Sequence, residues 1–514
     1  MAVQAGSVVR RNVIANVVGG GWIVLLNLIS IPVQIRLLGV ESYGLIGFVI
    51  SLQAFLMILD FGLSTTVVRE IAGDSSADHQ ESRHLIQTSA SIYWLVASLI
   101  AIGLILSAPW LANQWLNLEE LPTARAVEAF RILGIWLLFT WPFVLYTSIL
   151  TGLQRLDIAN VLRVISQSVA QGGAILLLLI SKDLILFSWW LAGSAAVSTI
   201  VAILITKRLV PSLSLGPRIS KSVILQIWRF SLDVNLISIL AIVFTQLDKL
   251  FIGRLLPMRM LGHYNAAYNI SRGVAVIQGF INTAVLPALA SDHRAGDFTI
   301  LRGHYYRYAQ SLVYTVTLPS LILIFFADPI LELWVSADTA RAASTALILL
   351  GVGFWLNAVM SATYSLAVAS GHTRIPLKVN IAIVGIYLPA LYFLIRSMGI
   401  DGAGVTWLGL NLYYFVTLLP LTQRRIIQSS SIGWLRKNVF PFFSIGLLIF
   451  ILAKQTFLFL GERNTYAFAL LILVTSGIYL FLGYFFLEKR TREQLQEIPV
   501  LILKSMRTAI LHQK

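Results

Sequence analysis

Long apolar stretches alternate with short polar connections along almost the whole chain. Fourteen of these stretches are about 20 residues long, the length of an α-helix that crosses a hydrocarbon core of about 30 Å. They lie near residues 13–35, 43–67, 86–107, 128–150, 159–180, 184–206, 224–248, 262–287, 306–327, 344–367, 378–397, 402–423, 439–459 and 464–486. Their apolar residues run continuously and do not alternate with polar ones, which favours helices over a membrane β-barrel. The pattern predicts an all-α integral membrane protein of about 14 transmembrane helices.

The composition indicates that lipid is the main solvent of this chain. Of its 514 residues, 57% are hydrophobic and only 12% are charged. Lysine and arginine are most frequent in Lys207–Arg229, in Arg424–Lys437 and in the tail from Glu488, all on one predicted side of the membrane. The positive-inside rule makes that side cytoplasmic. We therefore expect a multi-pass protein of the bacterial inner (plasma) membrane with both termini in the cytoplasm.

The ends and the net charge add two expectations. The first apolar stretch is too long for the apolar region of a cleaved signal peptide, so it is expected to remain as the first helix. The net charge of +15 is spread over many loops, which favours contact with anionic membrane lipids and not with nucleic acid.

Catalytic and metal-binding patterns are missing from the sequence. There are no cysteines, and the seven histidines fall in predicted loops, in the tail or, for His263, at the first turn of the predicted stretch 262–287, without metal-ligand spacing. Solvated loop histidines are the favoured interpretation. Asp60-Phe61-Gly62 matches a kinase magnesium triplet by its letters alone, and neither a phosphate-binding loop nor a Ser-His-Asp arrangement accompanies it. We expect no catalytic residues, no metal and no cofactor, and hence no enzyme.

An internal repeat of about 218 residues runs through the chain. Arg36-Leu37-Leu38 at the end of the first predicted helix recurs as Arg254-Leu255-Leu256 at the end of the seventh. Further matches at similar offsets include Trp115 with Trp334, and collinear matches of this kind indicate a true repeat. Because each copy holds an even number of helices, both copies cross the membrane in the same direction, as a parallel repeat about the membrane normal.

The repeat divides the chain into predicted lobes. Residues 1–217 form an N-lobe with helices 1 to 6, and residues 218–430 form a C-lobe with helices 7 to 12. Residues 431–487 hold helices 13 and 14, which lie outside the repeat, and residues 488–514 form a cytoplasmic tail. Two parallel lobes are expected to share a central cleft.

Polar residues form one-sided stripes on the first two helices of each lobe. A one-sided polar stripe on a transmembrane helix needs either a watery cavity or a polar partner helix. The candidate cleft residues are Asn16, Asn27, Asn235, Thr245, Gln246, Lys249, Asn269 and Arg272. The alternative, hydrogen bonding between neighbouring helices, stays open for the uncharged members.

The ionisable groups are the most informative members of these stripes. Arg272 lies too deep in its helix for easy access to the nearer interface, so it serves either a cavity or an internal ion pair with Asp248 or Asp60. Lys249 lies near the outer end of its helix, where a cleft role and an interfacial role are both open. Asp60 and Asp248 are candidate coupling or structural acids.

An ordered set of motifs carries a resemblance to a known family. The chain is similar to the polysaccharide (O-antigen) flippases of the multidrug/oligosaccharidyl-lipid/polysaccharide superfamily over about residues 8–430. The motifs are Arg36-Leu-Leu-Gly39 with Tyr43-Gly44, Leu59-Asp60-Phe61-Gly62-Leu63 to Arg69, Gly152-Leu-Gln-Arg155, Leu247-Asp248-Lys249-Leu-Phe-Ile-Gly253 and Leu261-Gly262-His-Tyr264.

The resemblance implies a fold and an activity. The fold would be two six-helix lobes around a V-shaped cleft, with helices 13 and 14 as in the fourteen-helix members. The activity would be translocation of polyprenyl-diphosphate-linked oligosaccharide units from the cytoplasmic to the outer leaflet by alternating access. The family's cationic cavity would fall on Arg272 and Lys249, and the asparagines would suit sugar hydroxyls. A polysaccharide polymerase and glycosyltransferases would be candidate partners.

Three other functions compete with this one. A cation-coupled drug or small-molecule antiporter of the same superfamily would need an intramembrane acid, and the first helix has none. A membrane glycosyltransferase or polymerase would need a sizeable loop with catalytic acids, whereas the loops here are about 15 to 25 residues at most. A scaffold protein would leave the polar stripes unexplained.

Overall fold

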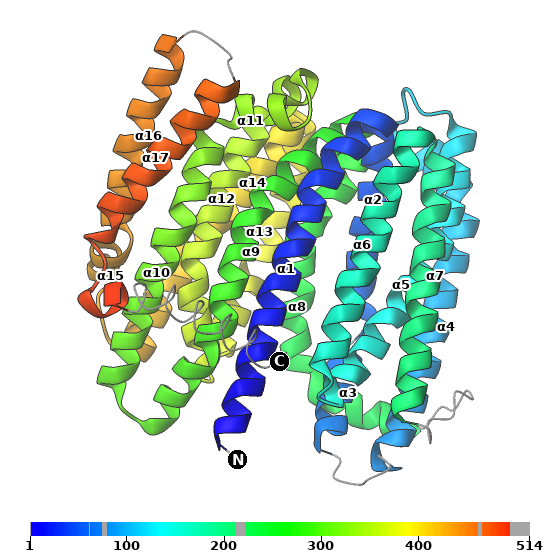
Figure 1. The fold of residues 1–514 in the computed structure, drawn as a ribbon, viewed down its shortest axis with the longest axis horizontal. Coiled ribbons are helices and arrows are strands. Elements are labelled where there is room, and N and C mark those ends of the chain that lie inside the picture. The colour runs from blue at the N-terminus through cyan, green and yellow to red at the C-terminus, as the bar shows by residue number, and fades with distance from the viewer. Residues whose placement is uncertain (1, 61, 74–79, 211–220, 461–464, 494–514) are drawn as a thin grey trace, which may run out of the picture. The chain divides into compact units, whose positions relative to one another are not determined.

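The computed structural model describes residues 2–60, 62–73, 80–210, 221–460 and 465–493 (Figure 1). The described residues form helices α1 to α17, three short helical turns and one isolated bridge, between Asn117 and Pro257. Thirteen helices are long and apolar enough to cross a membrane, and a fourteenth counts if a bent pair within residues 258–295 is one span. The prediction of an all-α integral membrane protein with about 14 spans is confirmed.

The chain divides into two compact units, and the first comprises residues 1–266, 332–343 and 391–403. Within it, α5 packs against both α4 and α7, and α1 packs against α6. Buried apolar side chains, among them Tyr93, Trp141 and Tyr146, form an apolar core of this unit. Its helices are α1 (Ala2–Leu38), α2 (Val40–Leu56), α3 (Leu63–Gly73), α4 (Gln80–Trp110), α5 (Thr123–Gly152), α6 (Leu156–Ile180), α7 (Leu184–Leu209) and α8 (Lys221–Leu255).

The second predicted helix, residues 43–67, is not continuous in the structure. It is interrupted after α2 by the short 3-10 turn η1 (Met57–Asp60), and α3 begins at Leu63. Gly62 has a φ of 75°, which interrupts a right-handed helix and suits glycine because it lacks a Cβ. The Asp60 carboxylate accepts hydrogen bonds from the backbone N–H of Ser64 at 3.3 Å and from its hydroxyl at 2.7 Å. Asp60 thereby satisfies free donors at the start of α3, as a capping residue does.

The second unit comprises residues 267–331, 344–390 and 404–514. Three of its helices, α9, α12 and α14, have their first residues in the first unit. Two others, α11 and α13, have their last residues there. The helices are α9 (Met258–Ala295), α10 (Phe298–Phe325), α11 (Ala327–Trp334), α12 (Ala337–Ala369), α13 (Arg374–Met398), α14 (Ile400–Thr422), α15 (Ser431–Asn438), α16 (Phe440–Leu460) and α17 (Thr465–Tyr484).

Within the second unit, α16 and α17 lie side by side and pack on α10 (Figure 1). Tyr314 of α10 stacks on Tyr479 of α17, with ring centroids 5.8 Å apart. The Tyr314 hydroxyl donates to the Leu480 carbonyl at 2.8 Å, and the Tyr479 hydroxyl donates to the Tyr314 carbonyl at 3.0 Å. These reciprocal contacts fix α17 to α10.

The predicted lobes stay a prediction. Their boundary at residues 217 and 218, and residues 494–514 of the predicted tail, lie outside the described residues.

Candidate functional site

The α8 helix carries a buried ion pair formed by two consecutive residues. The Lys249 ammonium lies 3.1 Å from the Asp248 carboxylate, and both side chains are less than a tenth exposed. The ammonium also donates to the Thr245 carbonyl at 2.7 Å. The Asp248 carboxylate accepts a hydrogen bond from the Tyr264 hydroxyl of α9 at 2.5 Å. Three of the predicted site residues, Thr245, Asp248 and Lys249, are therefore brought together within the first unit.

The surroundings of the Lys249–Asp248 pair compensate both of its charges. A buried charge is tolerated only when it is paired and hydrogen-bonded, and here both charges meet that condition. The Tyr264 ring adds a cation–π contact, with its centroid 5.9 Å from the Lys249 ammonium. Lys249 is therefore neutralised within the protein by Asp248.

Asp60 lies in a second buried cluster of the first unit. Besides Ser64, its carboxylate accepts a hydrogen bond from the hydroxyl of Tyr93 on α4. Tyr93 is completely buried and its ring packs on Trp141, with centroids 4.8 Å apart. No Lys or Arg lies within ion-pair distance of Asp60 among the residues that the structure describes. Neutral hydroxyl and amide donors hold this carboxylate.

Arg272 and Asn269 lie three residues apart on α9, in the second unit. Arg272 is exposed and Asn269 is partly buried. Arg272 has no ion-pair partner in the described part of the chain. It lies 14 residues, roughly 21 Å, from the start of the helix at Met258. A guanidinium therefore lies far from the nearer helix end without a carboxylate.

The remaining predicted site residues are spread over α1 and α8. Asn27 is exposed on α1, and Gln246 is partly buried on α8. Gln34, on the same stripe of α1 as Asn27, donates to Gln171 of α6 at 3.0 Å, so part of this stripe serves helix packing. Asn16 and Asn235 lie within α1 and α8, but their side chains are outside the described residues.

Two arginines of the repeated Arg-Leu-Leu motif form matching contacts within the first unit. Arg36 at the end of α1 donates to the carbonyls of Val335 at 2.8 Å and of Leu333 at 3.0 Å. Arg254 at the end of α8 donates to the Gln114 carbonyl at 2.8 Å. The Arg254 guanidinium also lies 5.7 Å from the centroid of a Trp115 ring. We refer to these two sets of contacts as the Arg36 latch and the Arg254 latch.

The same region contains a close approach of helix backbones. A Cβ on Gly262 of α9 would lie 2.1 Å from the Val40 carbonyl oxygen, and a Cβ on Gly44 of α2 would lie 2.4 Å from the Met258 carbonyl oxygen. Only glycine permits this approach, because any side chain would overlap with backbone atoms. The starts of α2 and α9 are therefore in direct contact beside the two latches.

His263 corrects the interpretation of the histidines as solvated loop residues. It lies in the second turn of α9, which begins at Met258 and not at residue 262 as predicted. Its side chain is buried, within 3.1 Å of the Thr339 hydroxyl and 3.4 Å of the Asp338 carboxylate. Within the described part of the chain, no group of three or more histidine, aspartate or glutamate side chains could hold a metal ion.

Sequence patterns did not reveal the tyrosine partners of the two acids. Tyr93 lies 33 residues from Asp60, and Tyr264 lies 16 residues from Asp248. Tyr264 belongs to the repeated Gly-Tyr element, and this repetition could have marked it as a candidate site residue. No comparable pattern in the sequence marks Tyr93. The arginines of the latches were found as repeat landmarks, but their contacts were not predicted.

Comparison with known proteins places the chain in a family. Residues 9–293, more than half of the chain, match the family model described as polysaccharide biosynthesis protein. The chain belongs to the polysaccharide biosynthesis protein family. Residues 235–393 of this family member also match the MatE model.

Several known proteins are similar to this family member. A Shigella flexneri protein described as a candidate O-antigen transporter is 24% identical over 405 residues, which cover 77% of this chain and 93% of that protein. The solved lipid II flippase MurJ aligns with a TM-score of 0.73 at 14% identity, covering 92% of this chain and 98% of MurJ. An inward-facing multidrug resistance MATE transporter aligns with a TM-score of 0.61 at 16% identity, over 79% of this chain and 94% of the other. The structural matches establish a shared fold.

Proposed function

We propose that this protein is a flippase that moves polyprenyl-diphosphate-linked oligosaccharide units from the cytoplasmic to the outer leaflet by alternating access. Its membership of the polysaccharide biosynthesis protein family supports this function. So does its similarity to a candidate O-antigen transporter and, in fold, to a lipid II flippase.

The chemistry of the substrate sets two requirements. A sugar head group cannot leave its hydration in hydrocarbon, so it needs a polar path, while the polyprenyl tail stays in the bilayer. The diphosphate needs a cation that is not already neutralised by the protein. Neutral amides and hydroxyls, such as those of Asn27, Gln246 and Asn269, suit the sugar.

The exposed guanidinium of Arg272 is the observation that carries the proposal. A charge in the middle of a transmembrane helix costs about 2.5 to 3.5 kcal/mol even on the lower scales, so it is retained for a reason. Lys249 is committed to Asp248, whereas Arg272 has no carboxylate partner among the described residues. A guanidinium can hold phosphate oxygens through two parallel hydrogen bonds. We assign the principal diphosphate contact to Arg272 and a positioning role on α8 to the Lys249–Asp248 pair.

The latches fit the outer closure of an alternating-access cycle. The positive-inside rule puts the ends of α1 and α8, where Arg36 and Arg254 lie, at the external face. In this scheme both latches open when the head group is released to the outer leaflet, and both reform when the empty protein returns.

The alternative is a cation-coupled drug or small-molecule antiporter of the same superfamily. One observation favours it, because Asp60 is a buried carboxylate within a predicted span and lacks a cationic partner in the described residues. A carboxylate of this kind could carry a proton or a sodium ion. Against it, Asp60 already serves the start of α3 through Ser64, which gives it a structural task.

Replacement of Arg272 tests the proposal. We expect Arg272→Ala to lower flipping by about 10- to 100-fold, since hydrogen bonds to charged groups contribute about 1.5 to 3 kcal/mol, and Arg272→Lys to retain part of it. Flipping of a fluorescent polyprenyl-diphosphate oligosaccharide is measured in vesicles that contain equal amounts of purified protein. Arg396→Ala, at an exposed arginine in the last turn of α13, is the matched control and should flip normally.

Two results would contradict the proposal. Normal flipping by well-folded Arg272→Ala protein would remove Arg272 from the substrate path. Vesicles that exchange drugs or small cations at a high rate, but never flip the lipid-linked oligosaccharide, would favour the antiporter.

A further inference from the structure

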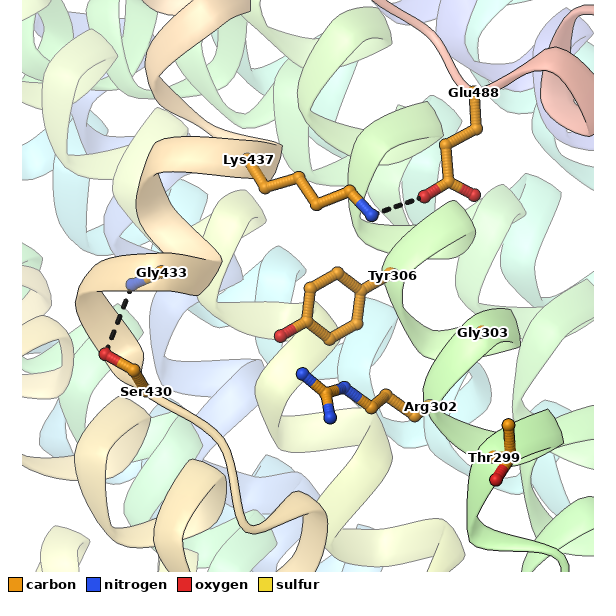
Figure 2. Close-up of a pocket in the computed structure, with 8 residues that line it drawn as sticks. All are labelled: Thr299, Arg302, Gly303, Tyr306, Ser430, Gly433, Lys437 and Glu488. Atoms are coloured by element: carbon orange, nitrogen blue, oxygen red, sulfur yellow. Dashed lines mark hydrogen bonds and ion pairs between the residues drawn. The ribbon is translucent and has the colours of Figure 1, made fainter.

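A cavity in the second unit lies between α10, α15 and Glu488, four residues after the end of α17 (Figure 2). Its volume is about 400 Å³. Arg302 and Tyr306 of α10, Ser430 and Lys437 of the α15 segment, and Glu488 are among the residues that line it. This cavity contains none of the residues assigned above to the transport path.

Two cations face one tyrosine ring in this cavity. The ring centroid of Tyr306 is 5.5 Å from the guanidinium carbon of Arg302 and 5.4 Å from the Lys437 ammonium. Glu488 lies 2.9 Å from the Lys437 ammonium, and Arg302 has no ion-pair partner within the described residues. The lining therefore carries two positive charges against one negative charge, and it has room for a further anion.

The α15 helix is held on α10 from the side opposite to solvent. The buried ring of Trp434 stacks on Tyr305 of α10, with centroids 6.1 Å apart and planes 17° apart. The side chain of Ser430 caps the helix by accepting from the Gly433 N–H. The cavity is therefore built on a docked helix.

The position of the cavity indicates the interface of the inner leaflet. Its lining residues lie in the first turns of α10, in the α15 segment and after α17, at helix ends that the positive-inside rule places on the cytoplasmic side. Residues 423–438 contain four Lys and Arg and no acidic residue. Beside these charges, Ile432 is 78% exposed and Phe440 is 65% exposed. Exposed apolar side chains next to cations are typical of a helix that lies at the boundary of head groups and acyl chains.

We propose that this cavity binds the phosphate head group of an anionic lipid in the inner leaflet. Arg302 donates two hydrogen bonds to the phosphate, and Lys437 supplies a second positive charge once it turns from Glu488. Ile432 and Phe440 contact the acyl chains, which distinguishes a lipid from a soluble phosphate. The bound lipid joins α10, α15 and the end of α17 at one point.

Lipid titration of the purified full-length protein tests this inference. Binding of phosphatidylglycerol and of phosphatidylcholine to detergent-solubilised protein is measured by native mass spectrometry. We expect phosphatidylglycerol to bind more tightly, and Arg302→Gln and Lys437→Gln to weaken its binding by about five-fold each, the factor for one cation near a membrane surface. Arg436→Gln, one residue from Lys437 and outside the cavity lining, is the matched control and should bind normally.

A gain of affinity provides an independent check. Glu488→Gln should bind phosphatidylglycerol more tightly than the unchanged protein, because it releases Lys437 from its ion pair. Thermal melting establishes that each variant is folded.

Three results would overturn the inference. The first is equal loss of binding in Lys437→Gln and Arg436→Gln, which would indicate a general charge effect. The second is equal binding of the two lipids. The third is displacement of phosphatidylglycerol by inorganic phosphate at a similar concentration, which would assign the cavity to a soluble anion.

Discussion

Arg36 and Arg254 lie 218 residues apart in the sequence, and each donates hydrogen bonds to backbone carbonyls next to a tryptophan of the other repeat. Arg36 binds the carbonyls on either side of Trp334, and Arg254 binds the carbonyl that precedes Trp115. The predicted repeat pairs these two tryptophans with each other, and within that prediction the two latches are equivalent contacts. Each tryptophan segment is held by the arginine from the opposite repeat.

The latches predict a change in access from the outside. We expect Arg36→Ala and Arg254→Ala each to raise the labelling rate of a Gln246→Cys variant by a membrane-impermeant maleimide by about 10-fold, since each loses charged hydrogen bonds. The measurement is clean because the natural chain contains no cysteine. Arg259→Ala breaks only an exposed ion pair with Glu119 and should leave the rate unchanged. Unchanged labelling in the double variant Arg36→Ala/Arg254→Ala would show that the latches do not close the outer face.

The Lys249–Asp248 pair predicts an asymmetric effect on stability. Lys249→Met alone leaves a buried carboxylate without its cation and should destabilise the protein by about 3 to 5 kcal/mol. Lys249→Met with Asp248→Asn should recover most of that loss, because the amide still accepts from Tyr264 and no buried charge remains. Thermal melting of the purified protein measures both. The exposed pair Arg125–Asp183 is the control, and Arg125→Met should cost less than about 1 kcal/mol.

The Asp60 cluster predicts that amide and carboxylate are interchangeable for transport. We expect Asp60→Asn to flip the lipid-linked substrate at the normal rate, since its carbonyl still accepts from Ser64 and Tyr93. Asp60→Ala should lose about 0.5 to 2 kcal/mol of stability, the range for a lost helix cap. Flipping at several pH values and melting temperature are measured on the same preparations. If the Asp60→Asn protein is stable but flips the substrate slowly, at a rate that no longer changes with pH, Asp60 is a coupling acid.

The charge of the substrate predicts that membrane potential assists transport. An inside-negative potential favours outward movement of a negative charge by about 2.3 kcal/mol per charge per 100 mV. The rate of head-group flipping in vesicles with an imposed inside-negative potential should therefore exceed the rate with the potential clamped at zero. Equal rates would indicate that the compensating positive charge moves together with the diphosphate.

The sequence was sufficient for those features that depend on periodicity and length. Apolar stretches of about 20 residues predict spans regardless of their partners, so the all-α class and the number of spans were predictable. The interruption of the helix at Gly62 was not predictable, because residues 43–67 keep their apolar character through the turn. Only the backbone conformation shows that the hydrogen-bond ladder is broken there.

Contacts between distant residues were the part that the sequence did not supply. Lys249 is the partner of Asp248, which depends on side-chain direction near the end of α8, whereas the sequence suggested only Arg272 as a cationic partner of Asp248. His263 was predicted to be solvated because it lies at the edge of its apolar stretch, but α9 begins four residues earlier, at Met258, and His263 is buried in its second turn. The burial of His263 follows from the way in which the starts of helices pack, and this packing cannot be read from the composition.

The two latches have the symmetry of a homodimer. In an isologous pair of identical chains, residue i of one chain contacts residue j of the other, and residue j contacts residue i in return. A single six-helix chain with one Arg-Leu-Leu motif and one tryptophan segment would form both latches by pairing with a second copy of itself about a twofold axis. Either half of the present chain, expressed alone, would have an arginine without its carbonyls and a tryptophan segment without its arginine. The two halves, expressed as separate polypeptides, would each supply what the other lacks.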